Sequence, residues 1–131
     1  MLFHAINRGK ESLALDLSQA GDVAMLRQLA RRADVVIQHY RPGVADRLGL
    51  GPDALRRVNP RLVVASISGY GPNGPLADRP GQDLLAQARS GVMWLTGDAA
   101  HGPVPMGLTV AGILAGATAA QNGAHAYLAA P

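Results

Sequence analysis

The chain has 131 residues, of which 48% are hydrophobic and 16% are charged, a balance typical of a globular protein of about one domain. Its 12 Lys and Arg exceed its 9 Asp and Glu, and the resulting charge of +3 falls short of the clustered basic face that nucleic-acid binding requires. The chain has no Cys, which excludes disulfides and thiolate metal sites and fits a reducing cytoplasm, where we expect the protein to act.

The first half of the chain predicts strands that alternate with helices, and its start lacks the apolar core of a signal peptide. The alternation from Ser12 to Leu17 predicts a strand. Apolar residues at helical spacing predict a helix from Asp22 to Arg32, and the two arginines that close it favour a helix C-terminus. Asp34 to Gln38 predicts a buried strand. Short helices are expected at Val44 to Leu48 and at Pro52 to Val58, where the proline fits a first turn.

The second half opens with the strongest strand pattern, the β-branched run from Arg61 to Ser68. This run stops abruptly in a loop dense in Gly and Pro, and a strand that ends this way usually delivers its loop to a binding site. A helix is expected from Gln82 to Ser90, closed by Gly91, and another from Leu108 to Leu128.

The last 25 residues, from Gly107 to Pro131, contain no charged side chain. They are mostly Ala and Gly, and Gln121, Asn122 and His125 interrupt them, whereas a membrane span needs roughly 20 strongly apolar residues. We therefore expect no membrane partner. The segment predicts a buried helix whose small side chains allow close packing against another element or another subunit.

The order of these elements predicts an α/β fold class, an open parallel sheet of Rossmann-like type with right-handed crossover helices. The strands Asp34 to Gln38 and Leu62 to Ile67 should be neighbours. Their carboxyl ends then deliver His39 to Gly43 and Gly69 to Pro75 to the same rim of the sheet. Ligands bind at this rim in open α/β sheets.

Three glycines in this loop, Gly69, Gly71 and Gly74, match the G-x-G-x-x-G pattern of dinucleotide-binding proteins. In that motif the glycines open a helix whose N-terminus faces the pyrophosphate. Here Pro72 and Pro75 interrupt the glycines, and several loop residues follow before any helical pattern. The pattern therefore does not indicate a redox dinucleotide site.

Three segments, in order, carry a resemblance to a known family: Asn7–Leu17 (NRGKESLALDL), Gln38–Leu50 (QHYRPGVADRLGL) and Asn59–Asp83 (NPRLVVASISGYGPNGPLADRPGQD). Together they resemble the family III CoA-transferases, a group that includes formyl-CoA transferases, carnitine-CoA transferases and α-methylacyl-CoA racemases. The resemblance runs from about Ala5 to Ala130.

The resemblance implies that residues 1–131 form part of a larger domain, because family members are several hundred residues long. Either a truncated chain or a remnant reading frame fits this length. The resemblance further implies coenzyme A and acyl-CoA as substrates, a carboxylic acid as the second partner, and an interlocked homodimer. It implies no metal or redox cofactor.

The resemblance also implies a set of CoA-contacting residues on three segments of the chain. These residues are Leu15, Ser18, His39, Tyr40, Arg41, Arg47, Pro80, Gln82 and Asp83. Tyr40 could stack on adenine, and Arg41 or Arg47 could meet a phosphate. Each has a plainer alternative: Arg47 could pair with Asp46 or Asp53, and Tyr40 could simply cover the sheet.

The catalytic pattern departs from that of the relatives. Family members typically read V-A-D-I-x-A-G where this chain has Val110 to Gly116, and their Asp is the nucleophile that forms an acyl-aspartyl anhydride. Gly112 stands at the position of that Asp. Asp83 and Asp98 match other family positions. Covalent catalysis needs a positioned nucleophile, so we expect this chain to be inactive as it stands.

Two alternatives to an inactive transferase fragment remain open. The first is a non-catalytic CoA-binding or oligomerising remnant. The second is a relative of the racemases, which use an Asp and a His as a pair of bases. In that branch the Asp position is again Gly112, and the His position is Gln82, which does not titrate near neutral pH.

No metal site is expected, because the four histidines do not follow a metal-ligand spacing. These are His4, His39, His101 and His125. No serine lies in a G-x-S-x-G elbow, so a serine nucleophile has no support either.

Overall fold

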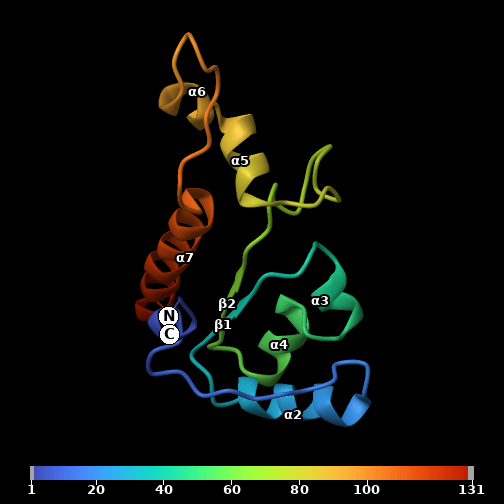
Figure 1. Cartoon of the computed structure of the whole chain (residues 1–131). Helices are drawn as coiled ribbons and strands as arrows, with labels where there is room; N and C mark the ends of the chain where they lie inside the picture. The colour runs from blue at the N-terminus through green and yellow to red at the C-terminus, as the bar shows by residue number, and fades with distance from the viewer. Residues whose placement is uncertain (1, 130–131) are drawn as a thin grey trace.

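The computed structural model describes residues 2–129, a mixed α/β structure built around two short parallel strands (Figure 1). The elements in chain order are α1 (Leu2–Ile6), α2 (Ala20–Ala30), β1 (Val35–Gln38), α3 (Val44–Arg47), α4 (Pro52–Val58), β2 (Val63–Ser66), α5 (Asp83–Ser90), α6 (Val92–Thr96) and α7 (Val110–Leu128). The helices and strands predicted for residues 22–68, 82–90 and 108–128 are therefore confirmed in type, with ends that differ by a few residues. The burial predicted for two of them is wrong: no residue of β1 is buried and Ile37 is 57% exposed, while Gly123 is the one buried residue in the described α7.

The two strands pair in parallel, in a register that sets Val35 opposite Val63 and Gln38 opposite Ser66. Helices α3 and α4 form the connection between them, which confirms the predicted strand, crossover, strand unit. In Figure 1, α7 lies on one side of the strands while α2 and α4 lie on the other. The carboxyl ends of both strands consequently point toward the same end of the molecule.

The core is small and lies between the strands and the α2–α4 pair. Its fully buried members are Ala30, Leu50, Leu55 and Leu62, and Leu55 is only 1% exposed. Asn59 follows α4 and joins this layer by polar contacts, since its Nδ2 donates hydrogen bonds to the carbonyl oxygens of Ala30 (3.1 Å) and Ala33 (2.9 Å). These two bonds satisfy carbonyl groups at the C-terminus of α2.

The loop that follows β2 is closed at its base by two glycines. A Cβ on either Gly69 or Gly81 would lie 2.3 Å from the Cα of the other, so the close approach of the two backbones requires glycine at both positions. The Arg89 guanidinium lies 5.7 Å from the centre of the Tyr70 ring and links this loop to α5. No helix begins at Gly74, as expected from the prolines around it.

Two parts of the prediction were wrong. Ser12 to Leu17 is not a strand: it has no neighbouring strand to bond to, and the Asp16 carboxylate instead organises a turn before α2 by accepting hydrogen bonds from the backbone and hydroxyl of Ser18. These bonds hold the pKa of Asp16 below its ordinary value. Short helices α1 and α6 were not predicted. Helix α6 follows α5 after a single left-handed residue, Gly91 at φ = 80°.

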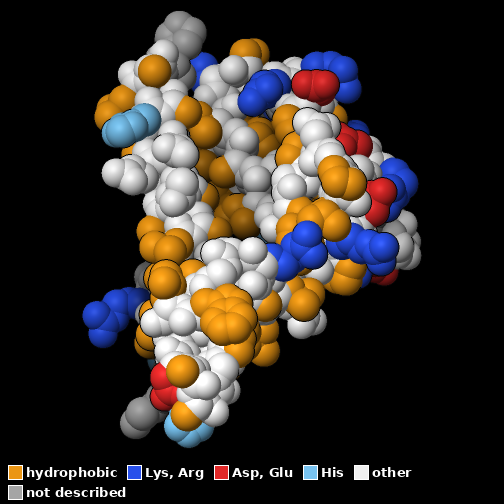
Figure 2. Space-filling model, turned by 90° about the horizontal axis from the view of Figure 1, so that it is seen from above, with side chains coloured by type: hydrophobic (Ala, Val, Ile, Leu, Met, Phe, Trp, Pro, Cys, Tyr) orange, Lys and Arg blue, Asp and Glu red, His pale blue; other side chains and the backbone are white. Residues whose placement is uncertain are grey.

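The chain exposes much more surface than a monomer of its size. Its accessible area is 9828 Å², whereas the usual scaling with mass gives about 6,600 Å² for 13.6 kDa. Large apolar side chains such as Trp94 (69% exposed), Leu95 (86%) and Leu114 (60%) contribute to the excess. Figure 2 shows hydrophobic side chains gathered around a hollow on one face. None of the helices described is long and apolar enough to span a membrane.

Candidate functional site

The rim of the sheet gathers the two segments that leave the strands. His39, Tyr40 and Arg41 follow β1 directly, and Ser68 and Gly69 lie two and three residues after the end of β2. The Tyr40 amide donates a 2.7 Å hydrogen bond to the Gln38 side chain, which fixes the exit from β1. The parallel pairing thus brings both segments to one place, as the sequence predicted.

A cavity of about 260 Å³ opens at this rim and is lined by polar and cationic residues. Its lining consists of His39, Tyr40, Arg41, Pro42, Ser68, Gly69, Ala77, Arg79, Pro80, Gly81 and Gln82. The guanidinium groups of Arg41 and Arg79 come from different loops, and both residues are exposed. Two arginines in the lining of one cavity suit an anionic ligand, because the guanidinium group bonds phosphate with paired N–H donors.

A second cavity of about 550 Å³ adjoins the first and extends to the N-terminal turn of α7. It is lined by His39, Ile67, Ser68, Gly69, Gly81, Gln82, Asp83, Ala86, Thr109, Ala111, Gly112, Ala115 and Gly116. The two cavities share five residues, namely His39, Ser68, Gly69, Gly81 and Gln82. They therefore form one cleft, cationic at one end and bounded by α7 at the other. We call this the rim cleft.

The α7 end of the rim cleft is organised by the Asp83 carboxylate. Asp83 Oδ1 accepts a 2.9 Å hydrogen bond from the Gly112 amide, in the first turn of α7, and Oδ2 accepts a 2.5 Å bond from Gln87. The Gly112 amide is the main reason that the pKa of Asp83 lies below its ordinary value, since burial acts in the opposite direction and Gln87 adds a smaller effect. A negative charge at this place also suits the N-terminus of a helix.

Gly112 leaves space at this end of the rim cleft. A Cβ added there would meet only Asp83 Oδ1, at 3.9 Å, which is an ordinary contact. A Cβ at position 112 therefore fits without displacement of the backbone.

The structure brings together most of the residues that the resemblance suggested. His39, Tyr40, Arg41, Pro80, Gln82, Asp83 and Gly112 all line the rim cleft. Leu15, Ser18 and Arg47 do not line it. Leu15 lies in the irregular segment before the turn that precedes α2, Ser18 lies in that turn, and Arg47 lies exposed at the end of α3. No ion pair of the described residues joins Arg47 to Asp46 or Asp53.

Sequence reasoning missed three residues of the rim cleft region: Arg79, Thr109 and Gln87. The sequence around Arg79 indicates only a loop of turn residues. The place of Arg79 in the lining of the cationic cavity follows from the close approach of Gly69 and Gly81. Gln87 had a visible signal, because it lies four residues after Asp83 and thus on the same face of the predicted helix.

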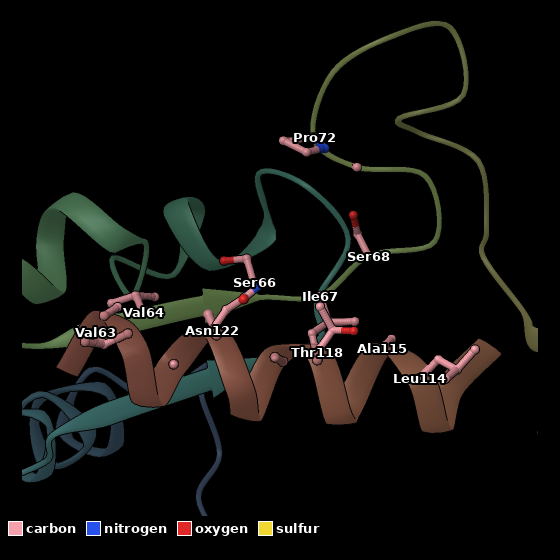
Figure 3. A pocket seen from close by; sticks show the side chains of 15 residues that line it. Val63, Val64, Ser66, Ile67, Ser68, Pro72, Leu114, Ala115, Thr118 and Asn122 are labelled. Atoms are coloured by element: carbon pink, nitrogen blue, oxygen red, sulfur yellow. The ribbon is translucent and has the colours of Figure 1, made fainter. Parts of the chain in front are cut away.

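A further groove of about 600 Å³ runs between β2 and α7 (Figure 3) and shares Ile67, Ser68 and Ala115 with the rim cleft. Val63, Val64 and Ile67 line it from the strand side, and Leu114 and Thr118 line it from α7. It contains no titratable side chain, so it offers no group for acid–base chemistry.

A histidine and an aspartate pair in the turn between α6 and α7. His101 Nδ1 lies 2.8 Å from Asp98 Oδ1, and this contact, with the His101 and Ala100 amides, lowers the pKa of Asp98. Both side chains are well exposed. Within residues 2–129, no three His, Cys, Asp or Glu side chains come together as a metal site would require.

Comparison with known proteins identifies the family. Residues 1–130 match the model of "CoA-transferase family III". The chain is 48% identical over 97 residues to the acetyl-CoA:oxalate CoA-transferase of Acetobacter aceti, which covers 74% of this chain and 25% of the relative. It is 43% identical over 98 residues to human α-methylacyl-CoA racemase, with coverage of 75% and 26%.

A solved structure also matches closely. The CAIB/BAIF family protein of Brucella suis superposes with a TM-score of 0.92 at 36% identity, covering 96% of this chain and 33% of that protein. The chain thus spans about a quarter of the length of the curated relatives and a third of this structure. Over that length, sequence and structure agree, and the chain belongs to CoA-transferase family III.

Proposed function

We propose that the rim cleft binds the CoA part of an acyl-CoA and presents its thioester to the first turn of α7. The observation that carries this proposal is that one cleft has Arg41 and Arg79 at one end and Gly112 at the other. An acyl-CoA has the same polarity, since its phosphates lie far from its thioester. The names of the relatives support a reaction of CoA esters.

The cationic end suits the phosphates of CoA. Its two guanidinium groups supply paired donors, and backbone amides of the glycine-rich loop supply further ones. Tyr40 is 42% exposed beside them and offers a face on which adenine can stack. Arg47 remains a candidate for an outer phosphate, although it lies outside the rim cleft.

The α7 end is where the acyl group would react. In a transferase with Asp at position 112, a carboxylate oxygen attacks the thioester carbonyl carbon, the C–S bond breaks and the CoA thiolate leaves. The CoA thiolate then attacks the aspartyl carbonyl carbon of the resulting anhydride and releases the first carboxylate. The acceptor carboxylate attacks the aspartyl thioester so formed and expels the thiolate again, and the thiolate takes the new acyl group and frees the Asp. Gly112 has no atom that attacks a thioester. The neighbouring Asp83 carboxylate is already bonded through both oxygens, so it is a poor nucleophile.

The function that these residues support best is therefore CoA binding without acyl transfer. Gly112 favours this non-catalytic function over an active transferase. A racemase function has less support, because neither Gly112 nor Gln82 exchanges a proton near neutral pH. Acyl transfer by this chain would require a nucleophile at a position other than 112.

We further propose that the exposed apolar faces are covered by a second copy of the chain within a Rossmann-like, interlocked dimer. The accessible area supports this proposal. It is 9828 Å², whereas about 6,600 Å² is expected of a monomer, so the difference is roughly 3,200 Å². Two copies that each covered an excess of this size would bury about 6,400 Å² in total, which lies at or above the upper end of the range for large obligate dimers, about 2,000 to 5,000 Å².

Calorimetric titration with CoA tests the binding proposal. Arg41→Ala and Arg79→Ala should each weaken CoA binding by about tenfold or more, because a charge-assisted bond contributes about 1.5 to 3 kcal/mol. Arg57→Ala is the matched control, since Arg57 lies exposed on α4, away from the rim cleft. Absence of CoA binding, or equal losses in all three variants, would contradict the proposal.

A further inference from the structure

Gln87 is the one polar residue among those buried in the described part of the chain. It lies in the middle of α5 and is 2% exposed. Burial of an amide is costly unless its donors and acceptor are all bonded. The partners of this side chain therefore indicate what it does.

The Gln87 amide bonds three groups on two segments. Its Nε2 donates to Asp83 Oδ2 at 2.5 Å and to the Leu108 carbonyl oxygen at 3.2 Å, and its Oε1 accepts from the Met106 amide at 2.9 Å. Asp83 Oδ1 in turn accepts from the Gly112 amide at 2.9 Å. Gln87 thereby reaches three points of the segment from Met106 to Gly112, two of them directly and one through Asp83.

We propose that Gln87 is a positioning residue that sets the place of residue 112 in the rim cleft. It fixes the backbone before α7 through Met106 and Leu108, and it orients the Asp83 carboxylate that holds the first turn. This inference rests on the proposed function, because it takes position 112 to be the acyl-transfer position. Gln87 itself does not line the rim cleft and acts only through its partners.

The chemistry of the site requires an amide rather than a carboxylate at position 87. Asp83 and the Leu108 carbonyl each need a donor, and the Met106 amide needs an acceptor, so only a side chain with both kinds of group satisfies all three. An ionised Glu would face two acceptors without a donor. A protonated Glu would regain one donor for Asp83.

Amide hydrogen exchange in the 131-residue chain tests the positioning role without any ligand. Gln87→Met keeps the size of the side chain and removes its polar atoms. Exchange at Met106 and Gly112 should accelerate by about tenfold or more, while exchange at Val63, in β2, changes by less than about twofold. Gln28→Met, on the exposed face of α2, is the control and should change none of the three. Equal acceleration at all three amides, or none at all, would overturn the proposal.

Gln87→Glu adds a signature that loss of packing would not produce. In this variant, exchange at Gly112, corrected for its intrinsic pH dependence, should be fast at neutral pH and slow down as the introduced carboxylate becomes protonated. The unaltered chain should show the opposite trend, because protonation of Asp83 weakens the hydrogen bond that it accepts from the Gly112 amide. A Gln87→Glu variant whose protection is independent of pH would contradict the role assigned to the amide.

The effect of Gln87 on acyl transfer is tested in chains that also carry Gly112→Asp. Addition of Gln87→Met should slow formation of an acyl adduct from acyl-CoA by at least about tenfold, with CoA affinity within about twofold, because small misplacements of a reacting group are costly. Equal adduct rates would refute the positioning role. If Gly112→Asp alone forms no adduct, the proposed transfer position fails, and the exchange data still decide whether Gln87 holds the segment.

Discussion

The structure makes its sharpest stability prediction at Asn59, whose side chain joins three parts of the fold. Nδ2 donates to two carbonyl groups at and beyond the end of α2, and Oδ1 accepts a 3.1 Å bond from the Arg61 amide at the approach to β2. Asn59→Ala removes all three bonds at once. The two carbonyl groups of Ala30 and Ala33 then lose a partly buried donor.

The expected loss is about 1 to 3 kcal/mol for Asn59→Ala, since each intramolecular hydrogen bond contributes about 0.5 to 1.5 kcal/mol and the Arg61 amide is exposed to solvent. Asn59→Asp should be less stable still at neutral pH. Its carboxylate faces two carbonyl oxygens at a helix C-terminus, where a negative charge costs about 0.3 to 1 kcal/mol more.

Urea unfolding followed by circular dichroism measures both variants, at one fixed protein concentration because association would shift apparent stability. Asn73→Ala, in the exposed loop after β2, is the matched control. The folded-state pKa of the carboxyl introduced by Asn59→Asp should be raised, so that variant should gain stability as pH falls. The reasoning is refuted if Asn59→Ala unfolds within about 0.5 kcal/mol of the unaltered chain, or if Asn59→Asp matches it.

Three further outcomes are expected. Leu55→Ala should cost about 2 to 5 kcal/mol in urea unfolding because Leu55 is 1% exposed, whereas Leu95→Ala, at 86% exposure, should change stability by less than about 0.5 kcal/mol. Sedimentation should give dimers or larger species, and a compact monomer at high concentration would contradict the proposed assembly. The lowered pKa of Asp83 stabilises the fold above the ordinary titration range of Asp, and this contribution should vanish as pH falls through the folded pKa. In Asp83→Asn, the NMR chemical shift of the Gly112 amide should no longer change with pH in the range where Asp titrates.

The β-branched and apolar pattern of the sequence was enough to predict the two strands that form the rim of the sheet, and the helices between them. Two β-branched runs, one before His39 and one before Ser68, are joined by the short helices α3 and α4. This order favours a parallel pair of strands, and the carboxyl ends of parallel strands lie at one rim. Gly91 was recognised as the end of α5. Its left-handed conformation also starts α6, which a pattern search that stops at glycine does not reveal.

Contacts between distant segments explain what the sequence did not predict. Ser12 to Leu17 alternates like a strand, but a strand forms only against a hydrogen-bonding neighbour, and the turn around Asp16 prevails instead. The place of Arg79 depends on the loop closure at Gly69 and Gly81, and the contacts of Gln87 with the segment before α7 depend on the packing of α7 on α5. The resemblance placed Arg47 among the CoA-contacting residues. The short helix α3, on which Arg47 lies, places it outside the rim cleft.

The central claim is that residue 112 stands where an acyl group from bound CoA would be transferred. Its most direct test is mass spectrometry of Gly112→Asp, made within a chain extended to full family length, after incubation with an acyl-CoA, with the Gly112 version of the same chain alongside. We expect a mass increase equal to the acyl group, located at residue 112, removed by hydroxylamine and matched by free CoA. The Gly112 version should carry no such adduct. An adduct on Asp83, or a Gly112→Asp chain that binds CoA yet never becomes acylated, would contradict the claim.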